Sequence, residues 1–238
     1  MKEEGLQEQK QSEKAEVLTY FNGTGFERWN RIYSNSDDVN KVQRNIRIGH
    51  QKTVDDVLSW IKEAGGISQQ SFCDAGCGVG SLSLPLLSLG AASVAASDIS
   101  DAMVAETKRR AELDGLDLTR MTFKTSDLES LNGLFHTVIC LDVFIHYPQK
   151  AAEEMVRHLC NLTEKRLIVS FAPYTPLLAL LKTIGQFFPG PSKTTRAYIL
   201  REKGIVNAAF QCGFRVKKRK LNQAPFYFSK IVEFEKIK

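Results

Sequence analysis

A glycine-rich turn after a short apolar run constrains this chain more than any other feature. Residues 72–75 have the composition of a buried strand, and Gly76, Gly78 and Gly80 follow in the pattern G-x-G-x-G. Glycine lets the backbone approach a ligand closely, because no Cβ stands in the way. A strand that enters such a turn is typical of α/β folds that bind nucleotide-like ligands. We therefore expect a dinucleotide or S-adenosylmethionine at this turn.

The spacing of the glycines and of two acids favours S-adenosylmethionine. The dinucleotide fingerprint G-x-G-x-x-G would place its third small residue at Ser81, whereas the third glycine comes one position earlier. Asp74 precedes the turn, and its carboxylate suits the ammonium of a methionyl tail better than a pyrophosphate. Asp98 ends the next apolar run, where it can accept hydrogen bonds from ribose hydroxyls, which both ligands have. A strand-to-helix turn without a ligand is the alternative.

Short apolar runs alternate with helical patterns beyond residue 66. We expect strands at about 71–75, 93–97, 121–124, 136–142, 165–171, 214–221 and 226–235, and helices at about 79–89, 100–114, 149–162 and 199–211. Such alternation produces a mostly parallel sheet with helices on both faces. A short turn at Pro225 joins the last two strands, so they should be antiparallel neighbours. The expected fold is α/β and Rossmann-like, with a seven-stranded sheet.

Three segments lie outside this alternation. Residues 1–15 are rich in charge, and we expect a disordered tail. Residues 16–65 contain a helix over about 37–63 and, before it, an aromatic segment around Gly23-Thr24-Gly25. We interpret 16–65 as a helical cap over a pocket, with a helix packed on the core as the alternative. Residues 66–238 form the main domain, with an insertion at about 174–198 that contains an apolar helix over 177–188 and a loop.

Composition narrows the class of protein. The chain has 238 residues, 43% hydrophobic and 25% charged, which suits one sizeable core. The net charge of +5 is diffuse, so we expect no nucleic-acid partner. Five irregularly spaced cysteines without a Cys/His cluster predict neither a metal site nor a disulfide framework. No apolar run reaches the ~20 residues of a membrane span, and no signal-peptide pattern precedes the domain. We expect a reducing compartment.

The carboxyl ends of the parallel strands should bring further candidates to the same edge of the sheet. Asp127 and Leu128 follow the third strand, where the carboxylate can accept from the adenine amino group and the backbone N–H can reach a ring nitrogen. Asp127 as the cap of a short helical turn is the alternative. Ile99 and Met103 are placed to flank the adenine, or else belong to the core, and Leu141 ends the fourth strand.

His146 follows the fourth strand, near the point where the methyl group of the donor should project. Histidine can orient an acceptor or take its proton near neutral pH. A structural histidine is the alternative. His50, His136 and His158 have no such placement in the predicted fold.

Five segments closely resemble one family, the magnesium-protoporphyrin IX O-methyltransferases of chlorophyll synthesis. They are YFNGTGF at 20–26, RIY at 31–33, DAGCGVG at 74–80, ICLDVFIHYP at 139–148 and FPGPSKTTRAY at 188–198. The resemblance runs from about residue 16 to the end of the sequence. Class I methyltransferases in general share the glycine motif, whereas the first and last segments are far more specific.

The resemblance implies a class I methyltransferase fold and methyl esterification of one propionate of magnesium-protoporphyrin, with S-adenosylmethionine as the cofactor. It makes Tyr33 and His146 the catalytic pair. This suits a carboxylate acceptor, which is ionised at pH 7 and asks for orientation more than for a base. Lys193 and Arg196 could pair with the propionates, with a solvated loop as their alternative.

Two other functions stay open at this point. One is a class I methyltransferase for another planar hydrophobic acceptor, such as a quinone precursor. The other is a tetrapyrrole carrier without catalysis, which the intact Asp74, Asp98 and His146 disfavour. We expect a monomer in the cytoplasm or plastid stroma, with a magnesium chelatase subunit and a peripheral membrane surface as partners to be tested.

Overall fold

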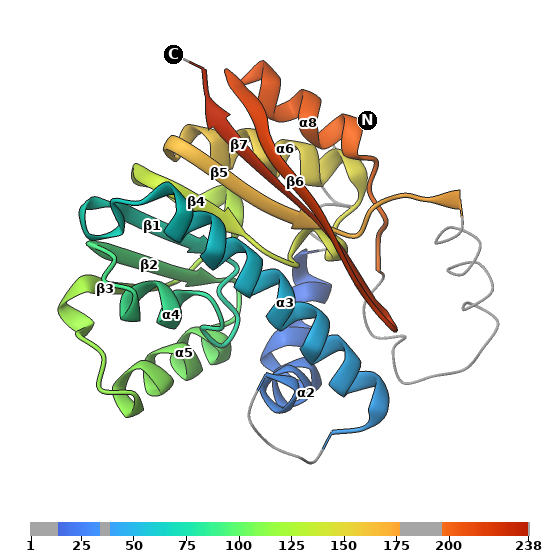
Figure 1. The fold of residues 1–238 in the computed structure, drawn as a ribbon. Helices are drawn as coiled ribbons and strands as arrows, with labels where there is room; N and C mark the ends of the chain where they lie inside the picture. The colour runs from blue at the N-terminus through green and yellow to red at the C-terminus, as the bar shows by residue number, and fades with distance from the viewer. Residues whose placement is uncertain (1–13, 34–38, 177–196, 238) are drawn as a thin grey trace.

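A single seven-stranded sheet organises the structure (Figure 1), a computed structural model that describes residues 14–33, 39–176 and 197–237. The strands are β1 (Ser71–Ala75), β2 (Ser93–Asp98), β3 (Met121–Thr125), β4 (Phe135–Cys140), β5 (Thr163–Phe171), β6 (Phe214–Ala224) and β7 (Tyr227–Lys236). Their order is β3-β2-β1-β4-β5-β7-β6. Strands β1 to β5 are parallel, and β7 runs antiparallel to both of its neighbours. The predicted mostly parallel sheet with an antiparallel C-terminal strand is confirmed.

Helices cover both faces of the sheet. The long helices are α3 (Lys41–Ala64), α5 (Asp101–Leu113), α6 (Gln149–Asn161) and α8 (Glu202–Gln211), and α4 (Ser83–Ser88) is short. One-turn helices are η1 (Ile67–Gln69), η2 (Leu118–Arg120), η3 (Leu128–Ser130) and η4 (Phe144–His146). Alternate residues of the central strands enter two separate cores: Val138 packs with α6 and α8, and Ile139 with α3 and α4. This alternation is the two-residue period of a strand buried on both faces.

The N-terminal helices lie at the carboxyl edge of the sheet. Residues 14–22 are helical, Gly23 forms a turn, and α2 (Thr24–Ile32) follows. Arginines clamp the C-terminal end of α2: Arg47 of α3 donates to the carbonyls of Arg31 and Ile32, and Arg110 of α5 donates to the carbonyl of Tyr33. Because the last carbonyls of a helix lack intrahelical partners, the two guanidinium groups satisfy and fix this end.

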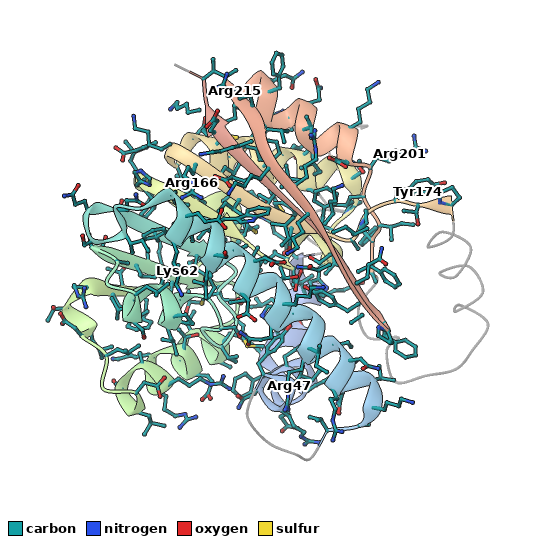
Figure 2. The ribbon with its side chains drawn as sticks, viewed as in Figure 1. Arg47, Lys62, Arg166, Tyr174, Arg201 and Arg215 are labelled. Carbon is teal, nitrogen blue, oxygen red and sulfur yellow. The ribbon has the colours of Figure 1, made fainter. Side chains whose placement is uncertain are left out.

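A buried ion pair within the sheet also anchors α3 through a hydrogen bond of its arginine. Arg166 of β5 donates to Glu233 of β7 at 2.8 Å and to the carbonyl of Trp60 at 3.2 Å. Figure 2 shows Arg166 inside the fold, whereas Arg201 lies at the surface beside Tyr174, with its guanidinium 5.2 Å from the tyrosine ring. Since both members of the buried pair have lost their water, removing one would leave an uncompensated charge. The pair therefore fixes how α3 sits on β5 and β7.

The element boundaries differ from the prediction at a few places. Helix α4 begins at Ser83 rather than 79, because Gly80 has a φ of +85° and cannot join a right-handed helix. Strand β6 extends to Ala224. The predicted helix at 177–188, with Lys193 and Arg196 and most of the predicted insertion, lies outside the described residues, as does most of the predicted tail. No helix within the described part is long and apolar enough to cross a membrane.

A candidate active site at the carboxyl edge of the sheet

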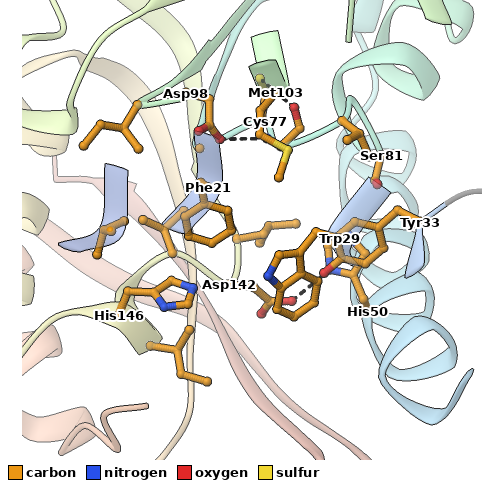
Figure 3. Close-up of a pocket in the computed structure, with 18 of the residues that line it drawn as sticks. Phe21, Trp29, Tyr33, His50, Cys77, Ser81, Asp98, Met103, Asp142 and His146 are labelled. Atoms are coloured by element: carbon orange, nitrogen blue, oxygen red, sulfur yellow. Dashed lines mark hydrogen bonds and ion pairs between the residues drawn. The ribbon is translucent and has the colours of Figure 1, made fainter. Parts of the chain in front are cut away.

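A cavity of about 320 Å³ lies where β1, β2 and β4 end (Figure 3). The strand ends contribute the glycine turn, Asp98 and Leu141 to its wall. The N-terminal helical segment closes the other side with Phe21 and Trp29. Described residues of the predicted cap segment line this cavity, and Phe21 also packs against the core.

The glycine turn is bound to the neighbouring strand through its backbone. The N–H groups of Gly76 and Cys77 donate to the carbonyl of Ser97 at 2.7 and 2.9 Å, and the N–H of Gly78 donates to the Asp98 carboxylate at 3.0 Å. Gly76 has a φ of +89°, and a Cβ there would overlap Val143. A Cβ at Gly78 would meet nothing within 4 Å, so this is the open side of the turn. The turn thus offers close approach, while these three N–H groups are already used within the protein.

Asp98 lies between the turn and the cavity. Its carboxylate accepts the N–H groups of Gly78 at 3.0 Å and Ser100 at 2.9 Å. Burial raises the pKa of Asp98, and these backbone donors act in the opposite direction. An ionised carboxylate has about four acceptor sites, so two stay available for hydroxyl groups in the cavity.

Asp74 and Gly80 support the turn from outside the cavity wall. The Asp74 carboxylate is buried and accepts a hydrogen bond from the Ser83 hydroxyl. Burial raises the pKa of Asp74 to about 6, against the effect of Ser83. Gly80 faces Thr107 and Leu84. In this structure neither Asp74 nor Gly80 lines the cavity.

The predicted adenine residues divide into two groups. Ile99, Met103 and Leu128 line the cavity, whereas Asp127 does not. Asp127 caps η3 by accepting the N–H of Ser130 at 2.8 Å, and it pairs with Lys14 at 3.2 Å. Burial alone would raise the pKa of Asp127, but these two partners hold it below its usual value. Asp127 therefore has the geometry of a helix cap, which was the alternative to a contact with adenine.

Tyr33 and His146 line the same cavity. His146 lies on η4 with its ring centroid 5.1 Å from that of Phe21, edge to face, and its Nδ1 atom is buried without a partner among the residues that the structure describes. Burial lowers the pKa of His146 to about 4, so the ring is neutral near pH 7. Burial and the nearby Asp142 keep the pKa of Tyr33 well above its ordinary value, so its hydroxyl stays protonated.

Sequence reasoning missed a buried cluster around Asp142. Asp142 has a φ of +57°, a conformation that aspartate tolerates better than most residues. Its carboxylate accepts from His50 Nδ1 at 2.8 Å, the Tyr227 hydroxyl at 2.7 Å, Ser170 at 2.9 Å and Ser229 at 3.1 Å. These donors come from α3, β5 and β7, far apart in the sequence. One feature of the sequence could have indicated that His50 is buried: it lies on the same face of the predicted helix as the apolar residues of α3.

Comparisons with known proteins agree on one family. Residues 140–236 match the family described as "Magnesium-protoporphyrin IX methyltransferase C-terminus", and residues 72–165 match "Methyltransferase domain". The chain is 50% identical to the chloroplastic magnesium protoporphyrin IX methyltransferase of Arabidopsis thaliana, over 93% of this chain and 70% of that protein. It is 49% identical to the magnesium-protoporphyrin O-methyltransferase of Synechocystis, over 93% and 95%.

Solved structures extend the match to the fold and the cofactor. The crystal structure of the Synechocystis enzyme with bound SAH has a TM-score of 0.85 and 47% identity, covering 92% of this chain and 98% of that one. The same enzyme with bound SAM has a TM-score of 0.82 and 42% identity, covering 94% and 97%.

Proposed function

This chain belongs to the magnesium-protoporphyrin IX methyltransferases, and from that premise we propose how its residues divide the work of methyl transfer. It is an S-adenosylmethionine-dependent O-methyltransferase of chlorophyll biosynthesis. We propose that an oxygen of one propionate accepts the methyl group, giving the monomethyl ester. One observation supports this proposal: the glycine turn and Asp98 line the same cavity as Tyr33 and His146.

The residues around the turn fit S-adenosylmethionine, which supplies an activated methyl group when it is bound. Open space at Gly78 would admit the ligand close to the backbone. Asp98 would accept hydrogen bonds from the ribose hydroxyls, and Ile99 and Met103 would pack against the adenine ring. Leu128 and Leu141 complete the apolar wall around the donor.

Tyr33 and His146 would orient the acceptor. A carboxylate is ionised near pH 7, so it needs alignment and exclusion of water rather than loss of a proton. The protonated Tyr33 hydroxyl can donate to one carboxylate oxygen. The neutral His146 ring can hold the acceptor without adding a charge to the buried site. A lone pair of the other carboxylate oxygen is then available to attack the methyl group.

Lys193 and Arg196 are proposed, from the sequence alone, to pair with the propionates. They lie in the segment between β5 and α8, next to Tyr198, whose backbone N–H donates to the carbonyl of Ile145 at 2.7 Å. This bond places the described end of the segment beside η4, and so close to His146. The proposed pairing rests on the charge of the two side chains and on their place in the sequence shortly before Tyr198.

A direct assay tests the function. The protein is incubated with methyl-labelled S-adenosylmethionine and magnesium-protoporphyrin, and the pigment is analysed for one methyl ester. A quinone precursor with a free phenol is offered in parallel, because it is the acceptor of the alternative methyltransferase. Label in the pigment ester supports the proposal. Label in the phenol alone, or no transfer to either, would refute it.

We also propose a compartment and partners for this protein. The relative from Arabidopsis thaliana is named chloroplastic, and this supports the plastid among the expected compartments. A magnesium chelatase subunit as a partner, a peripheral membrane contact and a monomeric state rest on the sequence resemblance. Co-sedimentation with vesicles and size-exclusion chromatography with and without chelatase subunits would test all three.

A further inference from the structure

His50 is buried in the cavity wall with only one of its two ring nitrogens bonded. The residue is 8% exposed, and its Nδ1 lies 2.8 Å from the Asp142 carboxylate. Its Nε2 is buried and has no partner among the described residues. A buried polar atom without a partner destabilises the protein, because it has lost its hydrogen bonds to water. Because His50 lines the cavity, a ligand there can supply the missing partner.

Asp142 determines which nitrogen of His50 carries a proton. Three hydroxyl groups, from Tyr227, Ser170 and Ser229, already donate to this carboxylate. Although burial acts to raise the pKa of Asp142, His50 and these hydroxyls hold it below its usual value. The carboxylate is therefore an acceptor only, and His50 Nδ1 must donate to it. Only Nε2 is left to contact a ligand.

A second unpartnered group lines the same cavity. The Trp29 indole Nε1 is buried without a partner in the described part of the chain. Trp29 stacks on Tyr33 with ring centroids 5.5 Å apart, and Tyr33 lies against His50 with centroids 4.3 Å apart. Figure 3 shows these three rings grouped on one side of the cavity, with Asp142 beside them. An indole N–H can only donate, so the ligand in this region must offer an acceptor atom.

We propose that His50 Nε2 and the Trp29 indole N–H hold the methyl-accepting carboxylate of the tetrapyrrole, and that Asp142 is the positioning residue that fixes the His50 ring. This inference rests on the proposed function, because the ligand is the substrate carboxylate. In the complex, His50 donates Nδ1–H to Asp142 and Nε2–H to the substrate carboxylate, so the ring takes up one proton from solvent when the substrate binds. It balances the buried charge that the substrate brings beside Asp142.

Magnesium offers a different partner for His50. A histidine backed by a carboxylate is also a common metal ligand, and it would bind the substrate magnesium through an unprotonated Nε2. That arrangement leaves the Trp29 N–H without an acceptor, whereas a carboxylate satisfies both groups. The observations therefore favour the carboxylate, and the two ligands predict different binding data.

Binding measurements separate the two ligands. His50→Gln, Trp29→Phe and the wild type are titrated with magnesium-protoporphyrin, metal-free protoporphyrin and the dimethyl ester of magnesium-protoporphyrin, with porphyrin fluorescence as the readout. We expect both variants to weaken binding of the two free acids by about 10-fold or more, and to bind the dimethyl ester as the wild type does. Loss of binding to both magnesium compounds but not to metal-free protoporphyrin would overturn the proposal in favour of metal ligation.

Kinetics test the positioning role of Asp142. We expect Asp142→Asn to lower kcat by about 10- to 100-fold, and to lower it little further in a His50→Gln background, because the two act as one unit. Imidazole added to His50→Ala should restore part of kcat. His136→Gln is the matched control, since His136 lies at the amino end of β4. Additive losses of kcat in the double variant would refute the positioning role of Asp142. Failure of imidazole to restore kcat, in a His50→Ala protein with wild-type thermal stability and S-adenosylmethionine affinity, would refute it as well.

The inference and the proposed function fail in different ways. If the wild type forms no ester with magnesium-protoporphyrin, the proposed function is wrong. If the wild type forms the ester and the His50 variants match it in tetrapyrrole Kd and in kcat, only the role of His50 is wrong.

Discussion

Gly49→Ala should separate α3 from β7 and weaken both stability and catalysis. Gly49 precedes His50, and a Cβ at this position would lie within 3.0 Å of three atoms of the Tyr227 side chain. The tyrosine cannot move aside easily, because its hydroxyl bonds Thr53 at 2.9 Å and Asp142 at 2.7 Å. The added methyl group therefore pushes on the same helix that carries His50.

Two opposing effects determine how much Gly49→Ala lowers the free energy of unfolding. Overpacking a buried contact costs about 1–3 kcal/mol. Replacing a helical glycine by alanine returns about 0.5–1 kcal/mol, because the unfolded chain loses conformational freedom. The midpoints of the two ranges give a net loss of about 1.3 kcal/mol, which for a chain of this size lowers Tm by about 3–5 °C.

Gly204→Ala is the matched control. Gly204 is also helical and crowded, but its added Cβ would meet the flexible ends of Glu153 and Gln149. Gln149 bonds Glu153 and the backbone of Arg201, but its bonds to Arg201 are exposed and water can replace them when the ends rotate away. We therefore expect the stability of this variant to stay within about 0.5 kcal/mol of the wild type. Urea unfolding, thermal melts and kcat with magnesium-protoporphyrin are measured for both variants. If Gly49→Ala proves as stable as Gly204→Ala, the close packing of α3 on Tyr227 does not constrain this site.

Three further outcomes follow from the described site. Asp98→Ala should raise the Kd for S-adenosylmethionine by at least about 10-fold in calorimetry, because two ribose hydroxyls lose their acceptor; an unchanged Kd would exclude the ribose contact. His146→Ala should lower kcat more than it weakens cofactor binding, and full activity would remove this ring from the mechanism. Since burial lowers the pKa of His146 to about 4, its protonated form is minor at neutral pH, and kcat should change less than about twofold between about pH 6 and about pH 8. Measured in the His50→Gln background, where His50 does not contribute, a fall centred near pH 6.5 would show that the His146 ring titrates normally.

The sheet and the donor side of the site were predictable because their signals are local. The strand that ends in Gly76-Cys77-Gly78 and the acid at Asp98 lie within one βαβ unit, where spacing alone places them at one edge. The wall residues Ile99 and Met103 follow from the same unit. The hydrogen-bond partners of these residues could not be predicted from the motif. The Asp74 carboxylate bonds Ser83, nine residues away, and does not face the cavity.

The acceptor side was less predictable because its contacts are long-range. His50 and Asp142 are 92 residues apart, and Tyr227 is 85 residues beyond Asp142. Spacing along the sequence cannot predict contacts among three elements that come together only in the folded protein. The left-handed conformation of Asp142 also redirects its side chain toward α3, and no motif predicts such a turn for a non-glycine residue.

The insertion of β7 between β5 and β6 has a consequence for how the protein matures. Strand β6 is made first but pairs with nothing in the sheet until β7 has formed between it and β5. Tyr227 and Ser229, at the start of β7, supply two of the four donors to Asp142. During synthesis on the ribosome, the donor-binding half can therefore fold while the cluster around Asp142 still lacks the two hydroxyl donors of β7. A nascent chain halted before residue 227 should retain the cofactor contacts but lack two of the donors that hold the Asp142 carboxylate beside His50.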